Sequence, residues 1–305
     1  MILRRFPGTG QGAGAGKDFS FFHRRNVVVY ARSRDISYAE HTAPLSVKSC
    51  LKGSETYEVS GVPMAVGEGA YLVLNNGQPY ASHIYSDEAV ESFCLFFRDG
   101  LEGEVLAAFE RPHEDLLDNP EGSPRWPAPF FQSLRRRDQL VSPLLARLHG
   151  RIAEGRAEQL WLDEQSGRLL EALLRAQGLA LREAERLPLA RRATRLEVYR
   201  RLCLARDYIE SCYVEPGGLR ELARVACLSP HHFLRLFKAA FGLTPHQYLT
   251  DVRLRQALRM VEGKSLSITD VCHSVGFEDA SSFTRLFKRR FGATPGERRR
   301  ARRES

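Results

Sequence analysis

Hydrophobic residues near the C-terminus recur with the spacing of an α-helix, and they do so twice. In segment 229–245, Phe233 begins an apolar stripe at i, i+3, i+4, i+7 and i+8, which predicts one buried helix face. Segment 279–295 repeats the stripe from Phe283, with Arg290 in the place of Ala240. Between residues 233 and 245, nine of thirteen positions match the residue 50 further on. Such a dense repeat indicates two copies of one supersecondary unit.

Both segments also carry the signals that begin and end helices. Ser229 and Asp279 occupy N-cap positions, where a short polar side chain accepts hydrogen bonds from free backbone N–H groups. Gly242 and Gly292 stand where a helix would end. Each glycine is followed by a Thr-Pro pair and, three residues after the threonine, by Gln or Glu. That arrangement predicts a further helix with a capping box.

A shorter apolar segment precedes each copy, at 219–226 and at 268–275. These two segments are 49 residues apart, so the second copy has one extra residue in its turn. A short helix, a tight turn and a capped second helix form a helix-turn-helix unit, whose second helix enters the DNA major groove. A connecting helix of about 17 residues from Pro245 to near Gly263, roughly 25 Å long, predicts second helices about one DNA turn, roughly 34 Å, apart.

The face opposite each apolar stripe is polar and basic. Side chains near a helix N-terminus can reach base edges, while later Lys and Arg residues suit phosphates. An ordinary solvated helix face is the alternative interpretation, and the duplication favours DNA binding over it. The residues on these faces are His231, His232, Leu234, Arg235 and Lys238 in the first copy and Ser281, Ser282, Thr284, Arg285, Lys288 and Arg289 in the second.

Several motifs from residue 198 onward have the pattern of a known DNA-binding domain. They are Ala205-Arg-Asp-Tyr-Ile209, Leu219-Arg-Glu-Leu-Ala223, Phe233-Leu-Arg-Leu-Phe-Lys238, Val275-Gly-Phe277, Phe283-Thr-Arg-Leu-Phe-Lys288, Phe291-Gly292 and Thr294-Pro295. The region resembles the DNA-binding domain of the AraC/XylS family of bacterial transcription regulators. The resemblance implies seven helices, with two helix-turn-helix units in successive major grooves of bent DNA. Cys227 stands where the family usually has a turn glycine, as Gly276 does in the second unit, so we expect the first turn to be either slightly strained or differently shaped.

The resemblance also assigns roles to the residues of the polar faces. By position, the base contacts fall to His231, Leu234 and Arg235 in the first unit and to Ser281, Ser282 and Arg285 in the second. We expect phosphate contacts from His232, Lys238, Thr284, Lys288 and Arg289 and from the tail Arg298–Arg303. The expected partners are double-stranded promoter DNA and RNA polymerase.

From Asn26 to about Phe97 the chain has the pattern of short strands separated by turns, which is typical of a small barrel or jelly roll. Glu55-Thr-Tyr57, Gly69–Asn75 and Asn76–Tyr80 resemble the cupin-like sensory domains that often precede this DNA-binding domain. The predicted strands are Val27–Ala31, Leu45–Leu51, Thr56–Val59, Ala70–Leu74, Ser82–Tyr85 and Val90–Phe97.

A cupin-type metalloenzyme with an accessory DNA-binding region is the competing hypothesis. Cupin metal sites need two or three histidines and a carboxylate, typically beginning with His-x-His, whereas His41 and His83 each stand alone. We therefore expect no catalysis, no metal and no cofactor; stoichiometric iron, zinc or manganese in the purified protein would favour the enzyme. A small organic effector fits a barrel better. The candidate contacts are His41, Tyr57, Tyr80 and His83.

After Phe97 the pattern becomes helical. Two amphipathic segments at about 139–153 and 157–177 predict a helical hairpin packed on the barrel. In the family that the C-terminal region resembles, the equivalent helices frequently dimerise, so we expect a homodimer. The stripes contain Leu140, Leu144, Leu145 and Leu148 in the first segment and Leu160, Leu169, Leu170, Leu173 and Leu174 in the second.

Composition and charge divide the chain in the same way. A length of 305 residues suits two domains. From Val198 onward there are 20 Lys and Arg against 11 Asp and Glu, a net +9, while the first 197 residues carry −1. This asymmetry is typical of a basic nucleic-acid-binding part beside a separate sensing part.

The six cysteines form no CxxC pair, which indicates reduced and mostly buried thiols. No signal peptide and no membrane span are expected, so we predict a cytoplasmic protein. The glycine-rich stretch 7–17 lacks the spacing of a phosphate-binding loop and suits a flexible tail.

The sequence therefore predicts an α+β chain, with a cupin-like β-barrel and a helical hairpin before an all-α domain of two tandem helix-turn-helix units. The predicted parts are a tail at 1–25, an effector-binding or dimerisation domain at 26–178, a linker at 179–197 and the DNA-binding domain at 198–305.

Overall fold

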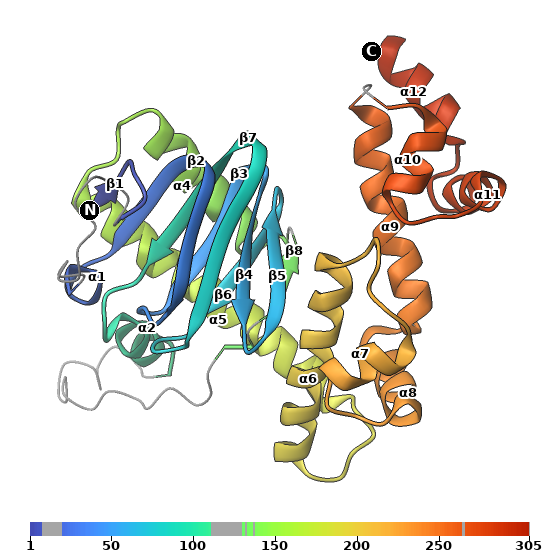
Figure 1. The fold of residues 1–305 in the computed structure, drawn as a ribbon. Helices are drawn as coiled ribbons and strands as arrows, with labels where there is room; N and C mark the ends of the chain where they lie inside the picture. The colour runs from blue at the N-terminus through green and yellow to red at the C-terminus, as the bar shows by residue number, and fades with distance from the viewer. Residues whose placement is uncertain (8–19, 111–129, 132, 137, 264–265, 305) are drawn as a thin grey trace. The chain divides into compact units, whose positions relative to one another are not determined.

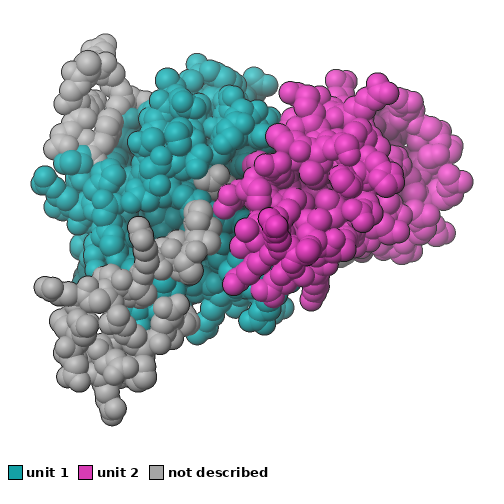
Figure 2. All heavy atoms as spheres, turned by 90° about the horizontal axis from the view of Figure 1, so that it is seen from below, with its two compact units in different colours: residues 1–183 teal, residues 184–305 magenta. Residues whose placement is uncertain are grey.

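The structure is a computed structural model that describes residues 1–7, 20–110, 130–131, 133–136, 138–263 and 266–304. Residue contacts divide the chain into two compact units (Figure 2), unit 1 from Met1 to Glu183 and unit 2 from Ala184 to Ser305. The described strands all lie in unit 1, and unit 2 is helical throughout its described elements. The α+β prediction is confirmed.

Unit 1 is built on one hydrogen-bonded sheet of eight described strands (Figure 1). The strand order is β1-β2-β7-β3-β6-β8, and β4 pairs with both β5 and β7. Only β1 and β2 run parallel to each other among these named strands. Because this order is open, closure into a cupin-like barrel stays a prediction. The strands are β1 Ile2–Leu3, β2 Val27–His41, β3 Ser46–Lys52, β4 Ser54–Val59, β5 Val62–Gly67, β6 Ala70–Leu74, β7 Tyr80–Phe96 and β8 Leu134–Arg136.

The long strand β7 contributes to both faces of the sheet, because successive side chains of a strand point in opposite directions. Phe93 and Leu95 belong to an apolar cluster that includes helical residues. Cys94 and Phe96 belong to a second cluster, which contains Phe22. The first half of β7 pairs with β4 and its second half with β3. One strand therefore joins the two parts of the sheet.

Helices α4 (Ser142–Ala153) and α5 (Gln159–Glu185) pack their leucines against the first of these faces (Figure 1). The predicted helical hairpin is therefore present. Leu160 is 82% exposed, because it precedes the part of α5 that packs on the sheet. Helices α1 (Phe21–Arg24) and α2 (Leu101–Glu110) complete the described helices of unit 1. The buried leucines are Leu145, Leu148, Leu169, Leu170 and Leu173.

The strands differ from the prediction in two respects. Strand β5 was predicted as turns because of Pro63 and Gly67; proline is tolerated there because β5 pairs only with β4. The alternation of buried Val62, Met64 and Val66 was the signal that was missed. Strand β7 is continuous where two strands were predicted, since the polar stretch 86–88 is exposed but remains extended.

The N-terminal residues also differ from the predicted flexible tail. Strand β1 pairs with β2, and Phe6 and Phe22 are only 7% and 6% exposed. The first seven residues and residues 20–25 therefore belong to the folded unit, while 8–19 lie outside the described residues. At the other end of unit 1, α5 extends to Glu185 and α6 begins at Arg192, so both helices enter the predicted linker.

His149 gives unit 1 an expected dependence on pH. Its ring lies 3.2 Å from the Ser49 hydroxyl and edge-on to Phe93. Burial lowers the pKa of His149 to about 4, against roughly 6.5 in an unfolded chain. The unfolded state therefore binds a proton that the folded state does not, and stability falls as the pH drops from about 6.5 to about 4. We expect His149→Phe to remove about 3 kcal/mol of that fall in the free energy of unfolding.

The measurement is urea unfolding between pH 4 and pH 7, followed by tryptophan fluorescence. His23→Phe is the control, since that histidine is exposed and paired with Asp99. An unchanged pH profile for His149→Phe would show that other groups cause the loss of stability.

Unit 2 consists of two helical cores that share one helix. The amino-terminal half of α9 packs against the first group of helices, and Leu254, Ala257 and Val261 in its second half join the core of the second group (Figure 1). The seven described helices agree with the number that the family resemblance implies. They are α6 Arg192–Ser211, α7 Leu219–Val225, α8 Pro230–Phe241, α9 Pro245–Glu262, α10 Ile268–Ser274, α11 Ala280–Phe291 and α12 Pro295–Glu304.

Candidate functional site

The two predicted recognition helices, α8 and α11, begin and end as their sequences indicate. The Ser229 hydroxyl accepts a hydrogen bond from the His232 backbone N–H, and the Asp279 carboxylate accepts from Ser281 and Ser282. Both helices end at glycines in the left-handed conformation, Gly242 and Gly292. Capping boxes start α9 and α12, as predicted. The ends of both helices are therefore set by residues of the same segment and do not depend on tertiary contacts.

Burial separates the two faces of each recognition helix. Phe233 and Phe237 in α8, and their counterparts Phe283 and Phe287 in α11, have no exposed surface. The predicted DNA-contacting residues lie on the other face; all are exposed except Ser282 and Thr284, which are half-buried. Within the described residues, five cations of these faces form no ion pair. They are therefore available to contact the phosphates or base edges of a DNA duplex. They are Arg235, Lys238, Arg285, Lys288 and Arg289.

The arginines of the basic tail, all of which were predicted to contact phosphates, differ in their exposure and in their contacts. Arg298 lies 3.8 Å from the Glu262 carboxylate, and Arg299 has two buried guanidinium nitrogens without a hydrogen-bond partner. Arg300 and Arg302 are exposed, and the side chain of Arg303 lies outside the described residues. Arg300 and Arg302 are therefore the better candidates for phosphate contacts.

The turns between the paired helices differ in the way that the register shift predicts. Four residues separate α7 from α8, and five separate α10 from α11. Each turn contains one residue with a left-handed backbone, Cys227 at φ +50° and Gly276 at φ +85°. The extra residue lies after Gly276, so both short helices end in the same way. At Cys227 the Cβ makes this conformation sterically unfavourable, whereas glycine has no Cβ and adopts it without strain.

Substitutions at these two turn residues are expected to change the stability of unit 2 in opposite directions. Cys227→Gly relieves strain at an exposed site and is expected to stabilise unit 2 by about 0.5–1 kcal/mol. Gly276→Ala is expected to cost about 2–3 kcal/mol, because a Cβ there would lie 2.7 Å from the Val214 carbonyl oxygen and 2.9 Å from the Arg253 guanidinium.

Urea unfolding followed by circular dichroism measures both variants. The steric argument fails if Gly276→Ala is as stable as the unchanged protein, or if Cys227→Gly destabilises it.

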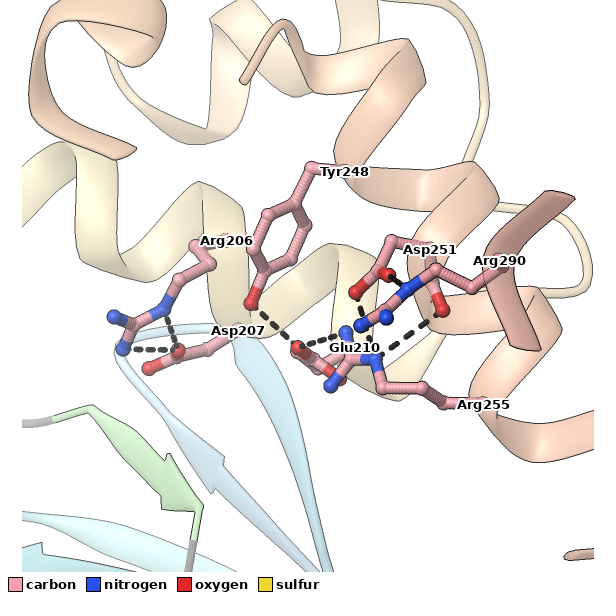
Figure 3. A network of polar contacts seen from close by, with 7 residues as sticks. All are labelled: Arg206, Asp207, Glu210, Tyr248, Asp251, Arg255 and Arg290. Carbon is pink, nitrogen blue, oxygen red and sulfur yellow. Dashed lines mark hydrogen bonds and ion pairs between the residues drawn. The ribbon is translucent and has the colours of Figure 1, made fainter. Parts of the chain in front are cut away.

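A network of charged side chains connects α11 to α9 and α6 (Figure 3). Asp251 pairs with two arginines. Arg290 Nε donates a 2.8 Å hydrogen bond to its Oδ1. Arg255 Nε forms an ion pair with its Oδ2 at 2.8 Å and donates a 3.2 Å hydrogen bond to its backbone carbonyl oxygen. Arg255 also lies 3.5 Å from Glu210, which accepts a 2.5 Å hydrogen bond from the Tyr248 hydroxyl. Because Arg290 replaces Ala240 of the first copy, only the second recognition helix has this tie to the connecting helix.

A separate cavity of about 390 Å³ lies within unit 1. Strands β2, β3, β4 and β7 all contribute to its walls, so the sheet curves around it. Three of the four predicted effector contacts, His41, Tyr57 and Tyr80, line this cavity together. His83 does not line it; its ring stacks on Tyr85, an exposed residue of the same strand.

The cavity also contains two charged residues that sequence reasoning missed, Lys48 and Glu55, which are 1% and 2% exposed. Burial lowers the pKa of Lys48, but Tyr80, Cys94 and Glu55 together raise it more, so this pKa lies above its ordinary value. The available signal was the single lysine of the predicted strand Leu45–Leu51, where Lys48 stands between Val47 and Ser49.

Comparison with known proteins bears on unit 2. A family model described as a helix-turn-helix domain matches residues 222–301, from α7 to α12. The arabinose operon regulatory protein of Escherichia coli is 29% identical over 56% of this chain and 57% of its own length. Unit 2 is an AraC/XylS-type DNA-binding domain. Helices α8 and α11 both lie within the matched residues of this DNA-binding domain.

Other similar proteins carry the names of regulators. The transcriptional regulator GlxA of Rhizobium meliloti is 27% identical over 87% of this chain and 92% of its own length. The probable transcriptional regulator LumQ of Photobacterium leiognathi is 34% identical over 31% of this chain. That match spans only 38% of LumQ, so most of either protein lies outside it.

None of the described helices combines the length and the hydropathy that crossing a lipid bilayer requires. In the same residues, no three His, Cys, Asp or Glu side chains gather as a group that could hold a metal ion.

Proposed function

We propose that the whole chain is a sequence-specific transcription regulator whose unit 2 reads a promoter and whose unit 1 responds to a small molecule. The observation that carries the proposal is the pair of capped helices with exposed, unpaired cations on one face and phenylalanines on the other. A duplicated reader of this kind recognises two short base sequences in one duplex. Regulation follows when such a site lies in a promoter.

Within this proposal, one set of side chains contacts the bases and another set contacts the phosphates. Base edges are read by His231, Leu234 and Arg235 in α8 and by Ser281, Ser282 and Arg285 in α11. Arginine is suited to guanine, because its guanidinium makes two hydrogen bonds to the base. Phosphates are held by His232, Lys238, Thr284, Lys288 and Arg289, which set affinity and salt dependence without reading sequence.

The remaining assignments concern partners and place. The cavity of unit 1 is the proposed effector site, with His41, Tyr57 and Tyr80 among its walls. A homodimer through the α4–α5 hairpin would place two readers on one promoter, and RNA polymerase is the machinery on which a bound regulator acts. Since these partners are in the bacterial cytoplasm, the protein is proposed to work there.

Footprinting of genomic DNA by the purified full-length chain tests the proposal. We expect protected sites that share a bipartite sequence, together with affinity that falls steeply as salt rises. Lys288→Ala is expected to weaken all sites alike and to reduce the slope of log affinity against log salt by about 1. Arg168→Ala, which removes an exposed arginine of unit 1, is the control and is expected to leave the slope unchanged. Protection without any shared sequence would contradict a specific regulator.

A further inference from the structure

The ammonium group of Lys48 lies inside the cavity of unit 1 with unused hydrogen-bonding capacity. Its Nζ donates one hydrogen bond, of 3.1 Å, to the Tyr80 hydroxyl. The same nitrogen lies 3.8 Å from the ring centroid of Phe96 and 5.0 Å from that of Tyr80, so aromatic faces stabilise the charge. An ammonium group has three donors. Among the described residues, two of the three therefore have no acceptor.

The Glu55 carboxylate lines the same cavity, and among the described residues it accepts fewer hydrogen bonds than its two oxygens allow. Its Oε2 accepts a 2.6 Å hydrogen bond from the Ser92 hydroxyl. Within the described part of the chain, Oε1 accepts no hydrogen bond, and no ion pair joins Glu55 to Lys48. A buried charge with unmade hydrogen bonds is costly, so both groups favour a molecule that supplies the missing partners.

The strand register and one hydrogen bond place these two charges near the same residue. Lys48 on β3 is directly opposite Cys94 on β7. Ser92, which holds Glu55, lies two residues before Cys94 and therefore on the same face of β7. A ligand group near Cys94 thus has both a donor, Lys48, and an acceptor, Glu55, in its neighbourhood.

The rest of the cavity sets the character of the ligand. Phe6, Phe22, Val29, Pro44 and Phe96 supply apolar walls, and a volume of about 390 Å³ suits a small organic molecule. The ammonium and the carboxylate balance each other, so a neutral ligand leaves no net charge in the cavity. An anionic ligand would bring a second negative charge close to Glu55.

We propose that this cavity binds a neutral, mostly apolar alcohol or phenol. Its hydroxyl oxygen accepts a hydrogen bond from Lys48, and its hydroxyl hydrogen is donated to Glu55. This inference rests on the proposed role of the cavity as the effector site and specifies the chemistry of that effector.

A matched series of four ligands tests the proposal by calorimetry with the full-length protein. The probes are 4-butylphenol, 4-butylanisole, butylbenzene and 4-butylbenzoate, which share one apolar body and differ in the head group. We expect 4-butylphenol to bind at least ~10-fold more tightly than the anisole, because a site built around a hydroxyl leaves its polar groups unpaired with the analogue. The benzoate is expected to bind more weakly than the phenol.

Two variants assign that preference to the named residues. Lys48→Met and Glu55→Gln are each expected to abolish the difference between phenol and anisole. The controls are Lys52→Met and Glu58→Gln, exposed residues of the same two strands, which are expected to preserve it. If a cavity variant fails to fold, the ligand series on the unchanged protein still decides. Equal binding of all four probes, tightest binding of the benzoate, or no binding of any probe overturns the proposal.

A second readout separates this inference from the proposed regulatory function. An electrophoretic shift with a footprinted DNA site is run with and without 4-butylphenol. DNA binding without phenol binding overturns the ligand assignment and leaves the DNA-binding function intact. Phenol binding that depends on Lys48 and Glu55 but never alters DNA affinity supports the ligand site and counts against its regulatory role.

Discussion

Alanine in place of Phe287 is expected to lower the free energy of unfolding of unit 2 by about 3–5 kcal/mol, and Phe237→Ala should cost a similar amount. Both rings have no exposed surface. Phe287 packs edge-on against Phe283 and Phe291 at centroid distances of 5.7 and 4.7 Å. Truncation removes these contacts and leaves a cavity, and a loss of this size is a large part of the stability of an ordinary domain, roughly 5–15 kcal/mol.

The chain itself provides two probes that separate the units in this experiment. Both tryptophans, Trp126 and Trp161, fall within the residue range of unit 1. During urea unfolding their fluorescence reports on unit 1, while circular dichroism also follows the helices of unit 2. We expect Phe287→Ala to move only the dichroism transition to lower urea.

Leu234→Ala is the matched control for these core variants, because Leu234 lies on α8 but is 39% exposed. Its expected cost is within about 0.5 kcal/mol. If Leu234→Ala destabilises unit 2 as much as Phe237→Ala does, the apolar and polar faces of α8 have been assigned wrongly.

The helices of unit 2 were predictable because their signals are local. An N-cap, an apolar stripe and a terminal glycine lie within one segment, and the duplication repeats them with few changes. The exceptions are informative. Arg290 appears in the sequence as a break in the repeat, but its partner Asp251 lies 39 residues away on another helix. A contact of that sequence separation follows from the packing of α9 against α11, which no local pattern contains.

Unit 1 was less predictable, because the signals of strands depend on distant partners. Short strands could be predicted where buried and exposed residues alternate clearly. Strand β5 was not predicted, since its proline and glycine resemble turn residues. The cavity was identified only in part: His41, Tyr57 and Tyr80 line it, whereas the fourth candidate, His83, does not. Lys48 and Glu55 come together because β3 and β4 both pair with β7. Such a pairing cannot be derived from either strand alone.

The double variant Arg235→Ala/Arg285→Ala is expected to weaken binding to the specific DNA site by about 2–6 kcal/mol, or roughly 30-fold to 10⁴-fold. Each arginine is exposed and free of ion pairs within the described residues, and each is assigned to a base edge in a different half of the site. Because each arginine lies on its own recognition helix, the two losses should add. Competition with DNA altered in one half-site should show relaxed specificity there for the corresponding single variant.

The control for this variant separates base reading from phosphate binding. Lys238→Ala/Lys288→Ala removes two cations from the same pair of helices, but it should weaken specific and random DNA by the same factor and reduce the salt slope by about 2. The arginine variant should instead reduce the ratio of specific to random affinity and leave binding to random DNA largely intact. Neither change should alter unfolding by more than about 0.5 kcal/mol, since all four side chains are exposed. Should both double variants lose specific and random binding equally, the two helices hold DNA only by its charge, and sequence must be read by other residues.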